Sequence, residues 1–439
     1  MTPRAILHPL SSILVLALLV GCGPNAHEIQ ATNAVQAYLA ADYPYAIHKL
    51  KPLADQTDEN YVLNNARLGS AALADYDLDT AEAAFLNAYE VINSTGVNSG
   101  GRGAAAAVFS EKMKVWKGEP FEKAMVNYYL GLVYYMRHDY ENARAAFENS
   151  LFKLRDYGES KDKDDAYRQV ESDFALGYLM LAKSFQRLGD EQAARKNFDR
   201  LLELRPKLRS LANYPRNEAS NVCLVIDYGY GPHRKTNDYD GAFVGFVPRP
   251  EEAGPIPLPR VTVDGVPAAG PRTDHYDLPP VDLLVLAQQK RWQDIDTIRA
   301  VKDVVGTGLM AGGGYEAYRF NRTGRGQDAA MAAGLFAAGL LLKASSQADV
   351  RTWEMLPRSS FVIPLALSPG QHDITVDFGR GESQTWRRLD VPDKGEVTYY
   401  FRVQRYPAHP QTWPPPAIAA KTTPPPQGST TNEVGSIHP

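Results

Sequence analysis

The sequence predicts a multidomain chain of the α plus α/β class. We expect an N-terminal α-solenoid built from repeats, then a smaller mixed domain with an antiparallel sheet and helices, and last a disordered tail. Three observations predict this layout. Small and large apolar residues recur at helical spacing through residues 28–210. After residue 220 the pattern changes to the short apolar runs of β-strands. From Pro407 onward there are nine prolines and no apolar periodicity.

The composition bounds the class of protein. With 439 residues and roughly 150 residues per domain, we expect two or three domains. A net charge of −4 gives neither a basic excess for nucleic acid nor the acidic excess of a disordered chain. Two cysteines cannot form a multi-disulfide framework. These values exclude a collagen, a coiled-coil rod, a disulfide-rich mini-protein and a polytopic membrane protein.

The first residues predict where in the cell the protein is located. An apolar stretch from Ile13 to Val20 is too short for a membrane span and suits a signal peptide. It ends in Leu19-Val20-Gly21-Cys22, which resembles a bacterial lipobox. The resemblance implies a signal peptide over residues 1–21, acyl chains (palmitate among them) on Cys22, and a short tether over 22–27. Gly23 stands where an aspartate would retain the protein in the inner membrane, which favours the outer membrane, facing the periplasm.

Three stretches of the helical region share one pattern, and a fourth follows it more faintly. The clearest reads Asn127-Tyr-Tyr-Leu130-Gly131-Leu-Val-Tyr134, followed by Ala143 and Phe147. Small residues occur where two helices cross closely, and large ones fill the space between crossings. The pattern resembles the tetratricopeptide repeat (TPR), which implies four helix pairs over residues 28–210 and a concave face suited to an extended peptide or a partner helix. The other copies contain Leu68-Gly69, Ala81 and Phe85; Leu181-Ala182, Ala194 and Phe198; and Ala34, Ala46 and Leu50.

Four side chains on or beside the helix that contains Asn127 are candidates for contacts with a partner. Tyr128, Tyr129, Tyr135 and Arg137 could line the concave face, and tyrosine and arginine are common at interfaces. Packing between helices is the alternative role of the tyrosines. A generic helical bundle is the alternative to the repeat fold, because loops at 96–103 and 158–165 interrupt the period.

The mixed domain is expected over residues 221–406, after a linker at 206–220 with two prolines. Its strands should form a small sandwich, or a sheet with helices on one side. The run Leu365-x-Leu367-Ser-Pro-Gly-Gln-His-Asp-Ile-x-Val376 resembles the strand–turn–strand of PEGA-type envelope domains. The expected strands are Val222–Ile226, Phe243–Val247, Pro259–Val263, Phe361–Leu367, Asp373–Phe378, Gln384–Leu389 and Val397–Val403; the expected helices are Leu283–Val305 and Ala329–Leu342.

Two further motifs relate the whole layout to known proteins. Gly118-Glu119-Pro120-Phe121-Glu122 leads into the Asn127 repeat, and Asp349-x-Arg351-x-Trp353-x-x-Leu356-Pro357 precedes the last strands. Together with the lipobox they resemble a poorly characterised family of bacterial cell-envelope lipoproteins with TPR-like repeats. The resemblance covers most of the mature chain, but not the tail over 407–439, and brings no catalytic residue with it.

The motifs of enzymes are not found in the sequence. It has no P-loop, no His-Glu-x-x-His, no Cys-x-x-Cys and no Gly-x-Ser-x-Gly, so we assign no catalytic residue, no cofactor and no metal site. Cys223 lies in an apolar run, where a thiol is an inert core group. His233 with Asp238 or Asp240 is a weak acid–base pair candidate, since such residues are often neighbours in loops.

These observations predict a non-enzymatic, lipid-anchored scaffold or adaptor that binds an envelope protein or peptide through its TPR-like half. The lipid confines it to the membrane and raises the local concentration of envelope partners. One alternative is an envelope enzyme of the peptidoglycan hydrolase type, with its site in residues 221–406. Another is a structural subunit of a secretion or export complex. The tail is expected to act as a solubilising segment, with a spacer or docking peptide as its alternatives.

Overall fold

The computed structural model describes the chain in eight stretches, and everything below refers to them. They are residues 26–93, 115–154, 174–236, 243–252, 254–269, 281–288, 351–379 and 381–404. The signal peptide, Cys22, the tail and the helix expected at Ala329–Leu342 lie outside these stretches, and so does most of the helix expected at Leu283–Val305.

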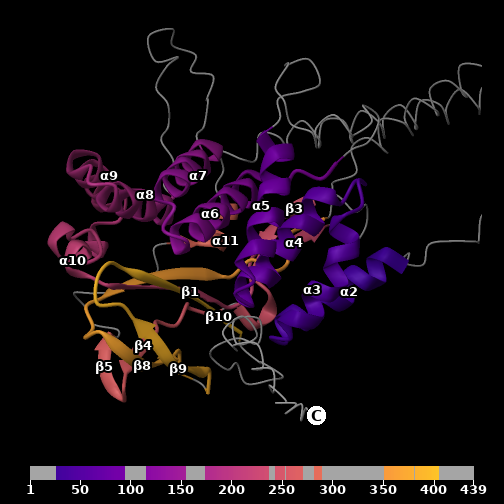
Figure 1. Cartoon of the computed structure of the whole chain (residues 1–439). Coiled ribbons are helices and arrows are strands. Elements are labelled where there is room, and N and C mark those ends of the chain that lie inside the picture. Colours follow the sequence, from indigo (N-terminus) through magenta and orange to yellow (C-terminus); the bar gives the residue numbers. More distant parts are fainter. Residues whose placement is uncertain are drawn as a thin grey trace, which may run out of the picture.

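Consecutive helices pack in antiparallel pairs through the first half of the chain (Figure 1). In each pair we call the first helix A and the second helix B. Each B helix also packs against the A helix of the next pair, as in a solenoid. The pairs are α2 (Ala26–Leu39) with α3 (Tyr43–Ala54), α4 (Tyr61–Ala74) with α5 (Leu78–Asn93), α6 (Pro120–Met136) with α7 (Tyr140–Lys153), and α8 (Ala175–Arg187) with α9 (Glu191–Leu204).

The repeated small and aromatic residues meet inside the pairs, as the TPR-like pattern predicts. A Cβ atom on Gly131 of α6 would come within 2.8 Å of the Phe147 ring of α7. A Cβ on Gly69 of α4 would come within 2.6 Å of the Phe85 ring of α5. In both pairs the glycine lets the two helices approach until the aromatic ring lies against bare backbone. The prediction of TPR-like helical repeats is therefore confirmed at the level of fold.

The turn between helix A and helix B has a second repeated feature, which is not part of the small and aromatic pattern. A residue with positive φ comes just before an aspartate, and the aspartate then begins helix B. Asp42, Asp139 and Asp190 each accept a hydrogen bond from a backbone N–H in the first turn of α3, α7 and α9, and Asp77 does the same for α5. The residues with positive φ are Ala41, Tyr76, His138 and Gly189.

In the second, third and fourth pairs the A helix is much more deeply buried than the B helix. Twelve of the 14 residues of α4 are buried, against five of the 14 residues of α7. A helix that is buried on all sides needs a cover on both faces. The B helices cover one face of the A helices, and the second half of the chain covers the other.

The strands form two four-stranded sheets and a hairpin. The first sheet has the order β10-β1-β7-β6, the second β5-β4-β8-β9, and β2 pairs with β3. The strands are β1 (Val222–Tyr228), β2 (His233–Thr236), β3 (Phe243–Val247), β4 (Arg260–Val263), β5 (Val266–Ala269), β6 (Val281–Asp282), β7 (Ser359–Leu365), β8 (Gly370–Asp377), β9 (Ser383–Val391) and β10 (Val397–Val403). The short helices are η1 (Pro206–Leu208), α10 (Tyr214–Ala219), η2 (Pro250–Glu252) and α11 (Leu283–Ala287).

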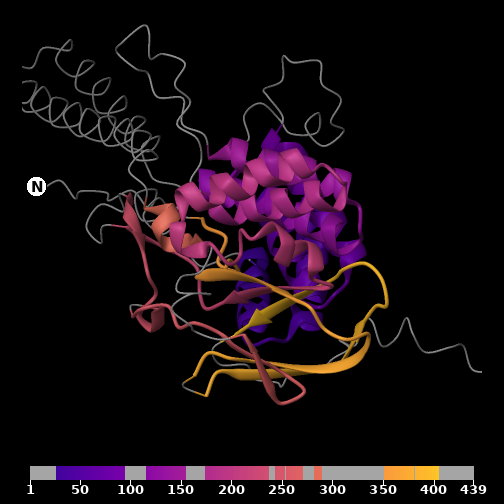
Figure 2. The same cartoon turned by 90° about the vertical axis from the view of Figure 1, so that its left-hand side faces the viewer.

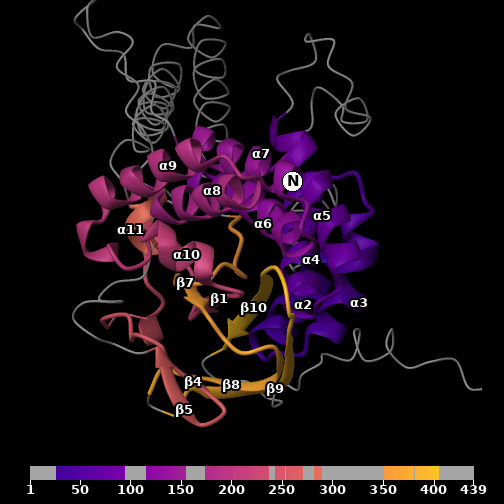
Figure 3. The same ribbon diagram turned by 60° about the vertical axis from the view of Figure 1, so that its left-hand side comes forward.

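The molecule has three layers: helices, the β1 sheet and the β4 sheet (Figure 2). The helices curve around the β1 sheet, with the β4 sheet on its other side (Figure 3). Aromatic rings join the two sheets: Trp386 stacks on Phe401 with ring centroids 3.8 Å apart, and Tyr228 stacks on Phe378 at 4.0 Å. The sequence offered a sandwich or a sheet with helices on one side, and the described chain has both.

Four details differ from the expected elements. β10 runs parallel to β1 rather than antiparallel, because the chain returns to this sheet through the second sheet. The Ser-Pro-Gly turn joins β7 of one sheet to β8 of the other, so it is a crossover and not a hairpin. His233, a loop residue in the expected layout, begins β2. The 206–220 linker contains η1 and α10.

Candidate functional site

The concave face of the helices is the surface that the repeats predict as a binding site. In the folded chain it is filled by the second half of the same protein. Tyr128, Tyr129 and Tyr135 are at most 3% exposed. The Tyr129 hydroxyl donates to Asp227 of β1 at 2.6 Å, and the Tyr135 hydroxyl donates to Glu396 at 2.7 Å. None of these three hydroxyls faces an open surface.

Arg137, the fourth candidate, lies apart from the tyrosines at the end of α6. Its guanidinium pairs with the carboxylates of Asp79 and Glu82 on α5. It is partly exposed and links two neighbouring helix pairs. The structure therefore does not bring the four candidates together as one patch.

The groove segment, residues 351–358, is neither helix nor strand, has a turn at residues 354–355 and lies along the A helices. The Trp353 ring packs at its edge against Tyr129, with centroids 5.8 Å apart, and its indole N–H donates to Ser70 at 3.1 Å. The Arg67 guanidinium of α4 holds the Glu354 carboxylate through two nitrogens, at 2.6 and 3.0 Å. Such a two-point pair fixes direction as well as position. The helices thus hold a peptide-like segment in a defined register.

Glu122 joins the two motifs that carried the family resemblance. One carboxylate oxygen accepts from the Glu119 backbone N–H at 2.8 Å, which closes a capping box at the start of α6. The other accepts from the Trp353 backbone N–H at 2.8 Å and from the Thr352 hydroxyl at 3.1 Å. Burial raises the pKa of Glu122 to about 7, although Arg234 and these donors favour the charged form.

A second buried cluster surrounds Asp227 on β1. Its carboxylate accepts from the hydroxyls of Tyr129, Tyr400 and Ser360. Burial raises the pKa of Asp227, and the hydroxyl donors only partly oppose this. The fully buried Arg402 donates to the Tyr38 hydroxyl at 3.0 Å and to backbone carbonyls, including that of Gly229 at 2.6 Å. The cluster links α2 and α6 to the middle of the sheet.

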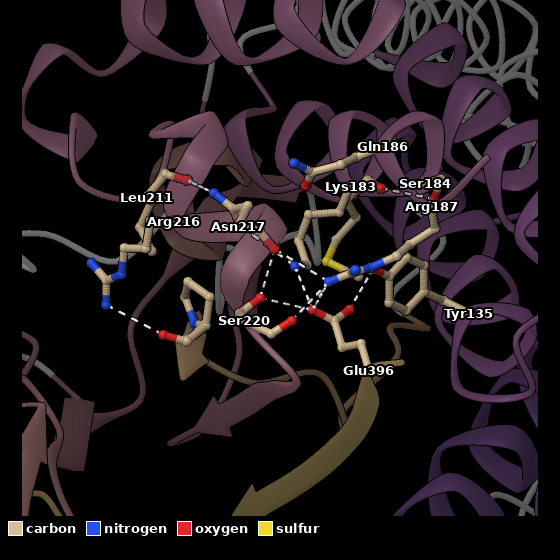
Figure 4. A network of polar contacts seen from close by, with 12 residues as sticks. Tyr135, Lys183, Ser184, Gln186, Arg187, Leu211, Arg216, Asn217, Ser220 and Glu396 are labelled. Atoms are coloured by element: carbon tan, nitrogen blue, oxygen red, sulfur yellow. Dashed lines mark hydrogen bonds and ion pairs between the residues drawn. The ribbon is translucent and has the colours of Figure 1, made fainter. Parts of the chain in front are cut away.

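A third cluster lies at the other end of the helices, around Glu396 (Figure 4). Glu396 accepts from Lys183 at 3.0 Å, Arg187 at 2.6 Å and Ser220 at 3.0 Å. Burial opposes its ionisation, but the two cations outweigh burial and lower the pKa of Glu396 to about 2. A buried carboxylate with two basic partners is a structural ion network that fixes α8 against the sheet.

The outer edge of β10 is covered by tyrosines from the helices. The Tyr76 hydroxyl donates to the Tyr400 carbonyl at 2.7 Å and accepts from the Tyr400 N–H at 2.8 Å. The Tyr43 hydroxyl donates to the Arg402 carbonyl at 3.3 Å. A strand edge leaves backbone groups unpaired, and Tyr76 takes the place of the missing neighbour strand.

One part of the concave surface stays open. A cleft of about 520 Å³ lies between α2, the start of α4 and the first residues of the groove segment. Its polar lining carries both signs of charge, which suits a charged and extended ligand better than an apolar one. The charged residues that line it are Glu28, Asp58, Glu59, Arg67, Arg249, Arg351 and Glu354.

Ser368, His372 and Asp264 are arranged in the order of a hydrolytic triad. His372 Nδ1 lies 2.7 Å from Asp264, while Nε2 lies 2.8 Å from the Ser368 carbonyl and 3.4 Å from its hydroxyl. A carboxylate and a carbonyl only accept hydrogen bonds, so both ring nitrogens must carry protons. The bond to Asp264 raises the pKa of His372 accordingly. The charged ring joins the turn between β4 and β5 to the turn between β7 and β8. Neither ring nitrogen has a free lone pair with which to act as a base.

The other two sequence candidates, Cys223 and His233, lie on strands. Cys223 is buried in β1, and burial raises the pKa of its thiol to about 12, so it is inert. His233 lies on β2, whereas Asp238 and Asp240 lie outside the described stretches. Within those stretches no group of three His, Cys, Asp or Glu side chains could hold a metal ion. No described helix is long and apolar enough to cross a bilayer.

The residues that join the two halves are not among the candidates that the motifs predict, although the sequence carries a signal for them. Lys183, Asp227 and Arg402 each lie within or at the end of an apolar run. A charge in such a run must be paired when the run is buried. Such residues therefore indicate a buried polar contact even before the partner is known.

The helix pairs and their shared crossings define the first half as a TPR-like repeat unit. The chain matches no protein-family model. It matches no curated protein either. Two solved structures of MamA show limited similarity. The first covers 45% of this chain and 83% of its own, with 12% identity and a TM-score of 0.28. The second, MamA AMB-1, covers 43% and 83%, with 17% identity and a TM-score of 0.27. The TPR-like assignment rests on the helix pairs of this chain.

Proposed function

We propose that this protein is a lipid-anchored scaffold of the bacterial cell envelope, held at the outer membrane through Cys22, whose TPR-like half binds a protein or peptide partner. The observation that supports it most directly is the groove segment. The A helices hold it through an aromatic contact at Trp353, a bond from the Trp353 backbone N–H to Glu122 and the ion pair of Arg67 with Glu354. A surface that holds one non-helical segment of the chain suits a second peptide segment where the surface is still open.

The partner segment belongs in the cleft beside α2. The cleft is lined by Arg351 and Glu354, so a peptide bound there would lie next to the start of the groove segment. The guanidinium of Arg249 lies over the Tyr230 ring, 5.3 Å from its centroid, and also lines the cleft. Arginine in such a position pairs with carboxylates of a partner.

Crosslinking in intact cells tests this assignment. Photoreactive residues at Thr32 and Gln36, which line the cleft, should capture the same partner. The same group at Arg195, an exposed residue of α9, is the matched control and should not capture it. Arg249→Glu should reduce capture at Thr32 by roughly tenfold through charge repulsion. Equal capture from all three positions, or no effect of Arg249→Glu, would refute the cleft as the binding site.

The anchor has its own test. Cys22→Ser should abolish acylation, which intact mass and detergent partitioning measure. A mature protein that begins at another residue and carries no lipid mass would refute the anchor.

Deleting residues 407–439 should leave fold and capture near normal, because a charge-poor, proline-rich segment offers few anchoring side chains.

A further inference from the structure

The outer side of the first helix pair exposes large apolar side chains. Ile29 of α2 is 49% exposed and Tyr45 of α3 is 43% exposed. The Gln30 side chain donates to the Lys49 carbonyl at 2.7 Å, so the start of α2 lies against the middle of α3. Ile29 and Tyr45 therefore belong to adjoining helices, at the end of the molecule where the described chain begins (Figure 1).

The helix α3 carries basic side chains and no acidic ones. α3 contains His48, Lys49 and Lys51 and no carboxylate, in a protein with a net charge of −4. The Lys49 ammonium lies 5.2 Å from the centroid of the Tyr45 ring. Tyrosine beside lysine on an exposed helix is typical of surfaces at the level of lipid headgroups.

The carboxylates around this pair are directed elsewhere or stand at the helix ends. Glu28 of α2 lines the cleft. Asp42 caps the start of α3 by accepting from the Tyr45 N–H, and Asp55 follows its last residue. The middle of the outer side of α3 is therefore basic and aromatic.

The distance to the proposed anchor is short. Cys22 precedes the first residue of α2, Ala26, by four residues. At roughly 3.5 Å per residue this stretch spans at most about 14 Å. Acyl chains on Cys22 would hold α2 and α3 within reach of the headgroups.

We propose that the outer side of α2 and α3 is a second membrane contact that rests on anionic lipid headgroups. The proposal depends on the proposed function, because the lipid on Cys22 brings this surface to the membrane. Lys49 and Lys51 attract the anionic surface, and Tyr45 and Ile29 enter the headgroup layer. Two contacts fix the orientation that a single lipid anchor leaves free, so the cleft beside α2 takes a defined position above the membrane.

The test uses the mature chain, residues 22–439, with Cys22→Ser so that no acyl group contributes. Sedimentation measures its binding to vesicles of phosphatidylglycerol with phosphatidylethanolamine, and to vesicles of phosphatidylcholine alone. We expect binding only to the anionic vesicles, and weaker binding at high salt. Lys49→Glu with Lys51→Glu should weaken it roughly tenfold. Tyr45→Ser should weaken it several-fold.

The chain offers a matched control. Phe152 of α7 is 45% exposed, and the Lys153 ammonium lies 5.9 Å from its ring centroid. The pair is similar, but α7 also carries Glu141 and Glu148 and so has no basic excess. Phe152→Ser with Lys153→Glu should leave vesicle binding unchanged, with circular dichroism as the check on folding.

Several outcomes would overturn the proposal: no vesicle binding, equal binding to both lipid mixtures, or equal losses in the α3 and α7 variants. A protein partner captured by Tyr45 without vesicle binding would overturn it too. The intact mass of the wild-type chain from cells reports acylation separately. A chain that is not acylated but binds vesicles refutes the anchor and not the α3 surface, and the reverse result refutes only the surface.

Discussion

At the scale of single residues, glycine in the A helices is required by a neighbouring ring and not by backbone conformation. Gly131 has ordinary helical geometry, but the Phe147 ring occupies the space of its side chain. Gly189 is the opposite case: its φ of +80° disfavours a side chain, while nothing lies within 4 Å of a Cβ there.

Replacing Gly131 with leucine should therefore destabilise the fold by about 1–3 kcal/mol through overpacking. Thermal unfolding followed by circular dichroism measures it as a lower melting temperature. Gly189→Ala is the control for backbone strain alone and should cost about 1 kcal/mol. An unchanged melting temperature of the leucine variant would contradict the close crossing.

Two of the buried glutamates, Glu122 and Glu396, respond to pH in opposite directions. Glu396 has its pKa lowered to about 2, so its contribution to stability is present above the ordinary value of 4.5 and is lost as pH falls toward 2. Glu122 has its pKa raised to about 7 from the same ordinary value. Between pH 4.5 and pH 7 the folded state therefore binds more protons at Glu122 than the unfolded state does.

Stability should therefore fall as pH rises from 4.5 to 7 by up to about 3 kcal/mol from Glu122 alone. Urea unfolding at several pH values measures this slope. Glu122→Gln should make it shallower, whereas Glu148→Gln on the exposed side of α7 should leave it as in the wild type. His372, whose pKa is also raised, contributes stability at low pH that is lost as pH rises through its folded pKa, and this part remains in both variants. Identical slopes for the wild type and Glu122→Gln would contradict the assignment.

At the scale of elements, the edge of β10 depends on a helix–helix turn. Tyr76 lies in the turn between α4 and α5 with a φ of +59°, and its hydroxyl makes two bonds with the backbone of Tyr400. The same left-handed turn recurs at Ala41 and His138 as part of the repeat. At position 76 it also directs a side chain to the sheet.

Tyr76→Phe should cost about 1–3 kcal/mol, because it leaves a buried carbonyl and N–H of β10 without their partner. Hydrogen exchange should show faster exchange of the Tyr400 amide. Tyr45→Phe removes a hydroxyl from a ring that is 43% exposed and should change neither quantity. If both variants behave alike, the edge is protected by something other than Tyr76.

At the scale of the whole molecule, the two halves share one interior. Trp353 is 1% exposed and lies between Phe85 of α5 and Tyr129 of α6, although it belongs to the second half of the chain. A split into an independent helical domain and an independent mixed domain would expose this ring. It would also expose the buried charges of Lys183 and Glu396.

The full chain should therefore unfold in one calorimetric transition rather than two. Trp353→Ala should lower the free energy of unfolding by about 3–5 kcal/mol, because it leaves a cavity between the halves. Calorimetry should show this as a lower transition temperature. Two separate transitions in the wild type, of which only one moves in the variant, would show that the halves fold independently.

Local signals in the sequence predict the helix pairs and several strands. The small and aromatic residues of the repeat predict the helix pairs, because close helix crossings select residues by size within one supersecondary unit. The strands at Phe243–Val247 and Val397–Val403 have the bounds that the apolar runs predict. Both are local signals, since each depends on neighbours within a few tens of residues.

The cover of the concave face follows from contacts between distant parts of the chain. The sequence placed Tyr129 and Tyr135 on that face, but their hydrogen-bond partners Asp227 and Glu396 are 98 and 261 residues away along the chain. Buried polar groups need partners, so the pattern predicts that a partner exists and not which residue it is. Whether a separate peptide or the chain's own groove segment covers the concave face depends on contacts across the whole sequence. Those contacts form only when the chain folds.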